Sequence, residues 1–140
     1  MDKEYYKEHR KNSFTMWSYA IQRIDLLIVA ISGAGIYVVL EALKYSLEHK
    51  LQNSLFLKFC GVVFLIALIV NFISQWTGEQ ANEHEIKFAD EKLDDKEDSA
   101  KIEASIADKW SGATIVLNIT SALSMFLALV LLVTYFFITF

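Results

Sequence analysis

Three long uncharged apolar stretches constrain the fold of this 140-residue chain more than any other feature. The clearest is Phe59–Gly78, which holds 20 residues without a formal charge. A helix of ~20 apolar residues is long enough to cross the hydrocarbon core of a bilayer, which is ~30 Å thick. Trp110–Phe140 has 31 such residues. As a helix it is long enough to cross the bilayer and extend beyond it, or to cross it at a tilt. The shortest stretch is Leu26–Leu40, and a span built on it must place Glu41 or Lys44 near a membrane interface.

The composition agrees with a membrane protein and excludes several soluble classes. Hydrophobic residues make up 54% of the chain, above the ~45–50% typical of soluble domains. The single cysteine, Cys60, cannot form an internal disulfide, so the chain is not a disulfide scaffold. A net charge of -4 removes the general electrostatic argument for nucleic-acid binding. Because the chain contains no proline, its helices can continue unbroken out of the membrane.

We therefore predict an all-α membrane protein with three transmembrane helices. The second and third spans extend as a cytoplasmic helical hairpin, and an amphipathic helix precedes the first span. The predicted segments are an N-terminal helix (1–23), a first span (24–47), an outer loop (48–54), a second span (55–78), an acidic hairpin (79–109) and a third span (110–140).

The distribution of basic residues predicts the orientation. Ten Lys and Arg residues lie in the N-terminal segment and in Glu79–Lys109, against three in the loop between the first two spans. By the positive-inside rule, the N-terminus is cytoplasmic and the C-terminus lies outside. The aromatic rings of Trp17, Trp76 and Trp110 would lie at the cytoplasmic interface. We expect no signal-peptide cleavage, because mixed charges precede the first apolar stretch.

The segment Glu79–Lys109 carries eleven acidic residues and five lysines, a local charge of -6. A disordered acidic loop is the alternative to helix here. Apolar residues at helical spacing and the absence of Pro and Gly favour two helical arms, with the break at Asp94-Asp95. The N-terminal segment either packs on this hairpin as a third helix or lies flat on the membrane surface.

Polar residues inside the predicted spans are the main candidate site, because they need a partner or water in lipid. These residues are Asn71, Gln75, Asn118 and Ser121. They either hold helices together, for example through an Asn71–Asn118 hydrogen bond within one protomer or between neighbouring protomers, or line a water-filled path in an oligomer. Small residues around Gly33 give the first span a smooth side that another backbone could approach.

The sequence contains little that supports a catalytic function. The chain has three histidines, none of them three residues after a Glu, so the Glu-x-x-His pair of di-metal bundles is missing. Glu79, Glu83, His84 and Glu85 form a cluster that is better explained as a solvated helix face than as a metal site. We expect no enzymatic activity, no metal and no cofactor.

The order of parts resembles that of small membrane effectors of prokaryotic defence systems, including the SLATT type. A charged aromatic helix (WSYAIQRIDLLIVA) precedes a span, a short basic loop, a second span and a long charged helix (HEIKFADEKLDD). The resemblance covers architecture over about two thirds of the chain, and the third span departs from it. It implies an oligomer that breaches or depolarises the inner membrane when a partner or a nucleotide sensor triggers it.

Two functional hypotheses follow. The first is an oligomeric channel or pore-type effector, with the lipid bilayer and other copies of the chain as partners. The second is an accessory or scaffold subunit whose acidic hairpin docks a basic cytoplasmic protein through Asp90, Asp94, Asp95 and Asp98. A proton-coupled transporter ranks third, because Glu41 is the carboxylate best placed for the membrane and lies at its edge.

Overall fold

Three long helices make up the protein in the computed structural model, α1 (Lys3–Glu48), α2 (Ser54–Leu93) and α3 (Glu97–Thr139). The backbone is described for residues 3–50 and 54–139, and side chains from Asn12 onward except at 13, 14, 17 and 54. Each helix contains a segment long and apolar enough to cross a membrane. The prediction of an all-helical chain with three such helices is therefore confirmed.

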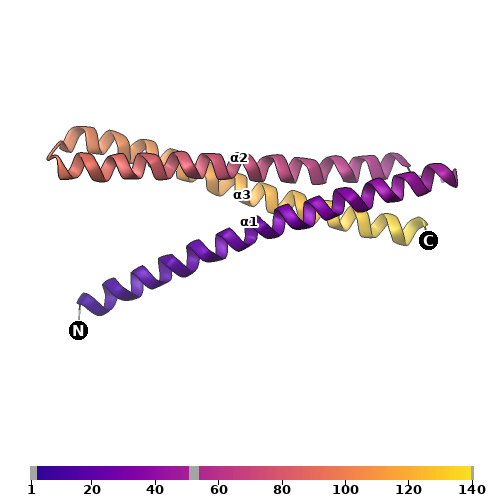
Figure 1. Ribbon diagram of the computed structural model, residues 1–140, viewed down its shortest axis with the longest axis horizontal. Coiled ribbons are helices and arrows are strands. Elements are labelled where there is room, and N and C mark those ends of the chain that lie inside the picture. The colour runs from indigo at the N-terminus through magenta and orange to yellow at the C-terminus, as the bar shows by residue number, and fades with distance from the viewer. Residues whose placement is uncertain (1–2, 51–53, 140) are drawn as a thin grey trace.

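The first helix runs without a break through the predicted boundary between the N-terminal segment and the first span. Its 46 residues contain no proline, so nothing in the sequence interrupts the backbone hydrogen bonds. The part of α1 that is long and apolar enough to cross a membrane lies within Ser18–Glu48, which contains the predicted first span. In Figure 1 the N-terminal half of α1 diverges from the other two helices. The predicted interfacial ring of Trp17 lies outside the described side chains.

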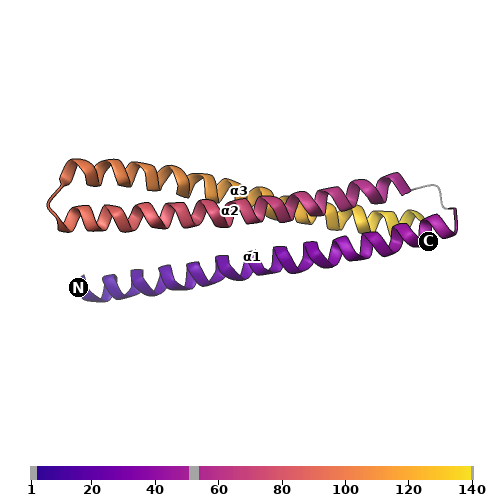
Figure 2. The ribbon, with the colours of Figure 1, turned by 45° about the horizontal axis from the view of Figure 1, so that its top comes forward.

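Helices α2 and α3 run antiparallel from their turn and cross each other, as both ribbon views show (Figures 1 and 2). The chain reverses at Asp94-Asp95-Lys96. Asp95 adopts a left-handed backbone conformation with φ of 58°, and the amide of Lys96 donates to the carbonyl of Glu91. The amide of Asp95 donates in turn to the carbonyl of Lys92. This pair of bonds is the Schellman arrangement that ends many helices.

Helix α1 packs against α2 through small residues on both partners. The ring of Phe64 lies directly over Gly35, where no Cβ would fit, and the side chain of Val39 lies 3.1 Å from the Cβ position of Gly61. These contacts belong to a core around Leu57, Cys60 and Phe64, all of them fully buried. A smaller core of Ile28, Ala67 and Met125 lies nearer the α2–α3 turn.

Most of the apolar surface remains uncovered in a single chain. Only 22–33% of the most apolar segment of each helix is buried. Large side chains on all three helices point outward, including Leu26, Phe72 and Phe126. Such an exposed apolar surface needs lipid or another protein surface to cover it.

Candidate functional site, a polar groove between the helices

The centre of the site is Asn71, a fully buried side chain on α2. Its Nδ2 donates a hydrogen bond to Oδ1 of Asp25 on α1, at 3.2 Å. Its Oδ1 accepts a hydrogen bond from Nε2 of Gln75, one turn away on α2, at 3.0 Å. The amide thus joins the two helices, and Asp25 lies level with Asn71 within the apolar part of the bundle.

A second set of polar contacts joins α2 to α3 beside the first. The hydroxyl of Ser74 contacts both the backbone carbonyl of Thr114 and Oδ1 of Asn118. The hydroxyl of Thr114 contacts that of Thr77 at 2.8 Å, and Thr77 donates to the carbonyl of Ser74 at 2.9 Å. Because a buried hydroxyl is costly without a partner, this ladder holds α2 and α3 at one register.

A groove opens where α1 departs from the α2–α3 pair, directly beside these contacts. We call it the polar groove. Its polar lining comes from all three helices and includes Gln22, Asp25, Gln75, Glu79, Asn82 and Asn118. The two views agree that α1 separates from its neighbours on this side of the bundle (Figures 1 and 2).

The charge in the polar groove has one sign. Asp25 and Glu79 are the formally charged residues in its described lining, and that lining includes no Lys or Arg. Arg23 is two residues from Asp25, but its guanidinium lies 5.1 Å from the ring centroid of Tyr19. The hydrogen-bond partner of the Asp25 carboxylate is therefore the neutral amide of Asn71.

The four polar residues predicted from the sequence divide into two pairs. Gln75 and Asn118 line the polar groove. Asn71 and Ser121 are buried between helices, with the Ser121 hydroxyl donating to the carbonyl of Ala67 at 2.8 Å. The expected Asn71–Asn118 hydrogen bond is wrong within one chain, because Asn71 is engaged by Asp25 and Gln75 and Asn118 by Ser74.

Sequence reasoning missed Asp25 as a member of the site. The predicted first span (24–47) contains Asp25, but the polar candidates did not include it, and the structure brings its carboxylate against Asn71. A polar pair at Gln22 and Asp25, three residues apart on one helix face, was the available signal.

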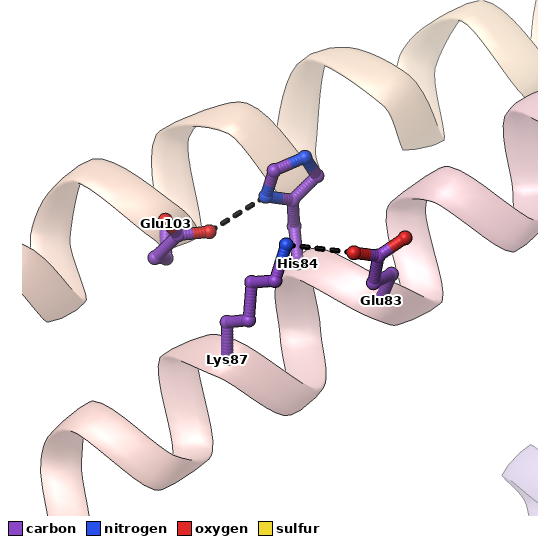
Figure 3. A network of polar contacts seen from close by, with 4 residues as sticks. All are labelled: Glu83, His84, Lys87 and Glu103. Carbon is purple, nitrogen blue, oxygen red and sulfur yellow. Dashed lines mark hydrogen bonds and ion pairs between the residues drawn. The ribbon is translucent and has the colours of Figure 1, made fainter.

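Beyond the polar groove, α2 and α3 are held together by a contact close to their turn. Figure 3 shows the imidazole of His84 facing the carboxylate of Glu103, with Nδ1 and Oε2 2.6 Å apart. Lys87 and Glu83 pair one turn apart on the same helix at 2.7 Å. Glu79 and Glu85 do not join them, and no cluster of three metal-ligating side chains occurs in the described part of the chain.

The predicted docking residues near the turn are accessible. Asp90, Asp94, Asp95 and Asp98 are all exposed. Lys96 lies 3.1 Å from Asp94, and this hydrogen bond raises the pKa of the lysine. Four exposed carboxylates on one end of the bundle leave a surface that is still strongly acidic.

The structure also places the tryptophans Trp76 and Trp110 and the single cysteine, Cys60. Trp76 and Trp110 meet edge to face, with ring centroids 5.6 Å apart, so the two rings lie at one level of the bundle. The thiol of Cys60 is fully buried and donates to the carbonyl of Ala128 at 3.2 Å. A thiol in this setting packs as a small apolar group.

Comparisons with family models, with curated proteins and with solved structures found no match for this chain. The resemblance to SLATT-type effectors therefore rests on architecture. At that level the chain is an all-helical protein with three helices apolar enough to cross a membrane.

Proposed function

We propose that the protein is a small, non-enzymatic, oligomeric inner-membrane protein that forms a cation-permeable channel or pore. The observation that carries the proposal is the polar groove, in which the Asp25 carboxylate lies beside Asn71 with no cationic residue in the described lining. A carboxylate at membrane depth is costly and is typical of ion pathways.

The depth of Asp25 supports this role. Asn71 is five residues before Trp76, which corresponds to ~7 Å along a helix. If Trp76 and Trp110 mark the cytoplasmic interface, Asp25 and Asn71 lie about 7 Å inside it. The carboxylate then lies within the cytoplasmic leaflet rather than at its surface.

Several copies would be needed to enclose a path. Three helices are too few to enclose a wide conduit by themselves, and the groove is open at the side of the bundle. In a ring of copies with this side toward the axis, each protomer would contribute one Asp25 and one Gln75. The exposed apolar side chains on the other faces would then meet lipid or neighbouring copies.

The chemistry of the groove favours cations. Rings of Asp or Glu select cations in channels, and amide oxygens such as those of Gln75 and Asn118 can replace part of an ion's hydration shell. Anions would meet Asp25 and Glu79 without a basic residue in the described lining.

A trigger would act through the helical hairpin, which we propose is cytoplasmic. Helices α2 and α3 are each continuous from their apolar segment to the turn. A movement of the turn would therefore be transmitted along both helices to the polar groove. A partner that binds this end could move α2 and α3 relative to α1. The architecture shared with defence effectors suggests a role of this kind in anti-phage defence.

Liposome flux tests this proposal. Purified protein at rising density in K⁺-loaded liposomes should release K⁺ more steeply than in proportion to density. Asp25→Asn should lower the preference for K⁺ over Cl⁻, read from the reversal potential in planar bilayers, and Gln75→Leu should reduce conductance. Asp90→Asn, an exposed acid remote from the groove, is the matched control and should change neither. Absence of flux at every density, with or without a trigger, would refute the proposal.

A second candidate function has its own observation. The exposed carboxylates at Asp90, Asp94, Asp95 and Asp98 would suit an accessory subunit that docks a basic cytoplasmic protein. Neutralising all four to Asn should abolish co-purification of that partner and should leave flux in pure liposomes unchanged. Retention of every partner by the neutralised variant would count against the scaffold role.

A further inference from the structure

The opposite end of the bundle from the polar groove carries a pocket that the proposed channel does not use. It lies between α1 and α3 and has a volume of about 300 Å³. Its lining is almost wholly apolar and comes from Tyr37, Val38, Ala42, Tyr45, Tyr135 and Phe136, together with the stem of the exposed Glu41 side chain. We call it the aromatic pocket.

The charge of the aromatic pocket is uncompensated. Glu41 is the charged residue in its described lining, and its side chain is exposed. Among the described residues, no basic group lies within the 4.0 Å of Glu41 that defines an ion pair. Lys44, one turn further along α1, is exposed and outside the lining.

The position of the pocket places it at a membrane surface. Val39 contacts Gly61 near the start of the second apolar stretch, so Glu41 lies level with the first residues of that stretch. Tyr135 stacks with Phe56 at the same end, with ring centroids 6.4 Å apart. Phospholipid headgroups occupy this level of a bilayer, and the exposed Val38 in the lining of the pocket suits an acyl chain.

Exposed aromatic rings next to a carboxylate, here Tyr37, Tyr45 and Phe136 beside Glu41, favour a particular kind of cation. An organic ammonium gains from the faces of Tyr and Phe rings, whereas a small hydrated metal ion would have to shed its water. The carboxylate adds charge-assisted hydrogen bonds to an ammonium that carries N–H groups. We propose that the aromatic pocket binds the ammonium headgroup of an ethanolamine phospholipid through Glu41 and the surrounding rings.

Native mass spectrometry of the full-length protein in detergent tests the proposal. The protein is mixed with equal amounts of phosphatidylethanolamine and phosphatidylglycerol that carry the same acyl chains. We expect wild type to retain the ethanolamine lipid about tenfold more than the glycerol lipid. Glu41→Gln should bring the ratio close to one, and Tyr37→Leu should lower it. Glu48→Gln, an exposed acid on the same helix outside the lining, should leave it unchanged.

Three results would overturn the proposal. Equal retention of both lipids by wild type would show that the nearby lysines or the acyl chains dominate. An unchanged preference in Glu41→Gln, with helical content confirmed by circular dichroism, would remove the carboxylate from the site. Equally tight binding of phosphoethanolamine without acyl chains would make the ligand a soluble ammonium. None of these results depends on channel activity, so the two proposals fail separately.

Discussion

At the scale of single residues, two glycines only two residues apart on α1, Gly33 and Gly35, lie on opposite faces of the helix and have opposite surroundings. A Cβ on Gly35 would meet three ring atoms of the buried Phe64 well inside van der Waals contact. A Cβ on Gly33 would meet nothing within 4 Å. Gly35 therefore sets how closely α1 approaches α2, and through that approach it helps to bring Asp25 opposite Asn71.

We predict that Gly35→Ala destabilises the protein by about 1–3 kcal/mol, because Phe64 must leave its packed position. Gly33→Ala should be neutral or slightly stabilising, since alanine favours a helix more than glycine does. Thermal unfolding in detergent, followed by circular dichroism, measures both. Equal melting temperatures for the two variants would contradict the role of Gly35, and Phe64→Leu should partly rescue Gly35→Ala.

The residue scale is also where sequence reasoning was least complete. Asn71, Gln75, Asn118 and Ser121 stood out because polar groups in apolar stretches need partners. Their actual partners depend on the register between helices, which small residues such as Gly35 and Gly61 set. No local pattern contains that register, so the pairing of Asn71 with Asp25 could not be read from the sequence.

At the scale of elements, the contact between His84 and Glu103 is a pairing of α2 with α3 outside the apolar segments. Both side chains are largely shielded, whereas the Glu83–Lys87 pair on one helix is about half exposed. Shielded contacts between elements contribute more than exposed pairs within a helix, because water competes less for the groups.

We therefore predict a coupling of about 1 kcal/mol between His84 and Glu103. It is measured by a double-mutant cycle with His84→Ala and Glu103→Ala in thermal or denaturant unfolding. The Glu83–Lys87 cycle is the control and should show no measurable coupling. Additive effects of the two substitutions at His84 and Glu103 would show that the contact does not hold the helices together.

The turn between α2 and α3 has a feature of its own. Asp95 adopts a left-handed backbone conformation. This conformation is costly for a residue with a Cβ but not for glycine. Asp95→Gly should stabilise the protein by up to about 1 kcal/mol. Asp94→Gly, where no positive φ is present, should be neutral or destabilising. Unfolding midpoints compare the two, and a lower midpoint for Asp95→Gly would contradict the prediction.

At the scale of the whole molecule, the apolar stretches were enough to predict three helices and an all-helical class, since each stretch has the length of a membrane span. They did not predict that α1 would be one helix through its charged first half, because the N-terminal helix (1–23) and the first span (24–47) were taken as separate segments. The distribution of basic residues predicts the direction of insertion into a membrane. Exposed residues at the two ends of the bundle can report that direction.

We predict that Asp98→Cys and Glu48→Cys lie on opposite sides of the membrane. Both positions are exposed, and Cys60 is replaced by Ala so that the introduced thiols report alone. A membrane-impermeant maleimide should label Glu48→Cys in intact cells and Asp98→Cys only after permeabilisation. The reverse pattern would invert the proposed orientation, and labelling of both in intact cells would contradict the assignment of three spans.

The last prediction concerns how copies meet. The face of α1 around Ala30, Gly33 and Ala34 is exposed and made of small residues, and other backbones can approach such a face closely. In a homo-oligomer assembled through this face, Gly33→Cys in the Cys60→Ala background should form a disulfide-linked dimer under mild oxidation in membranes. Ile69→Cys, on an exposed face of α2 with a large side chain, is the control and should cross-link much less. Equal cross-linking at both positions would indicate random collision. Cross-linking only at Ile69→Cys would show that copies meet through α2. In that case α1 would lie away from the contact between copies.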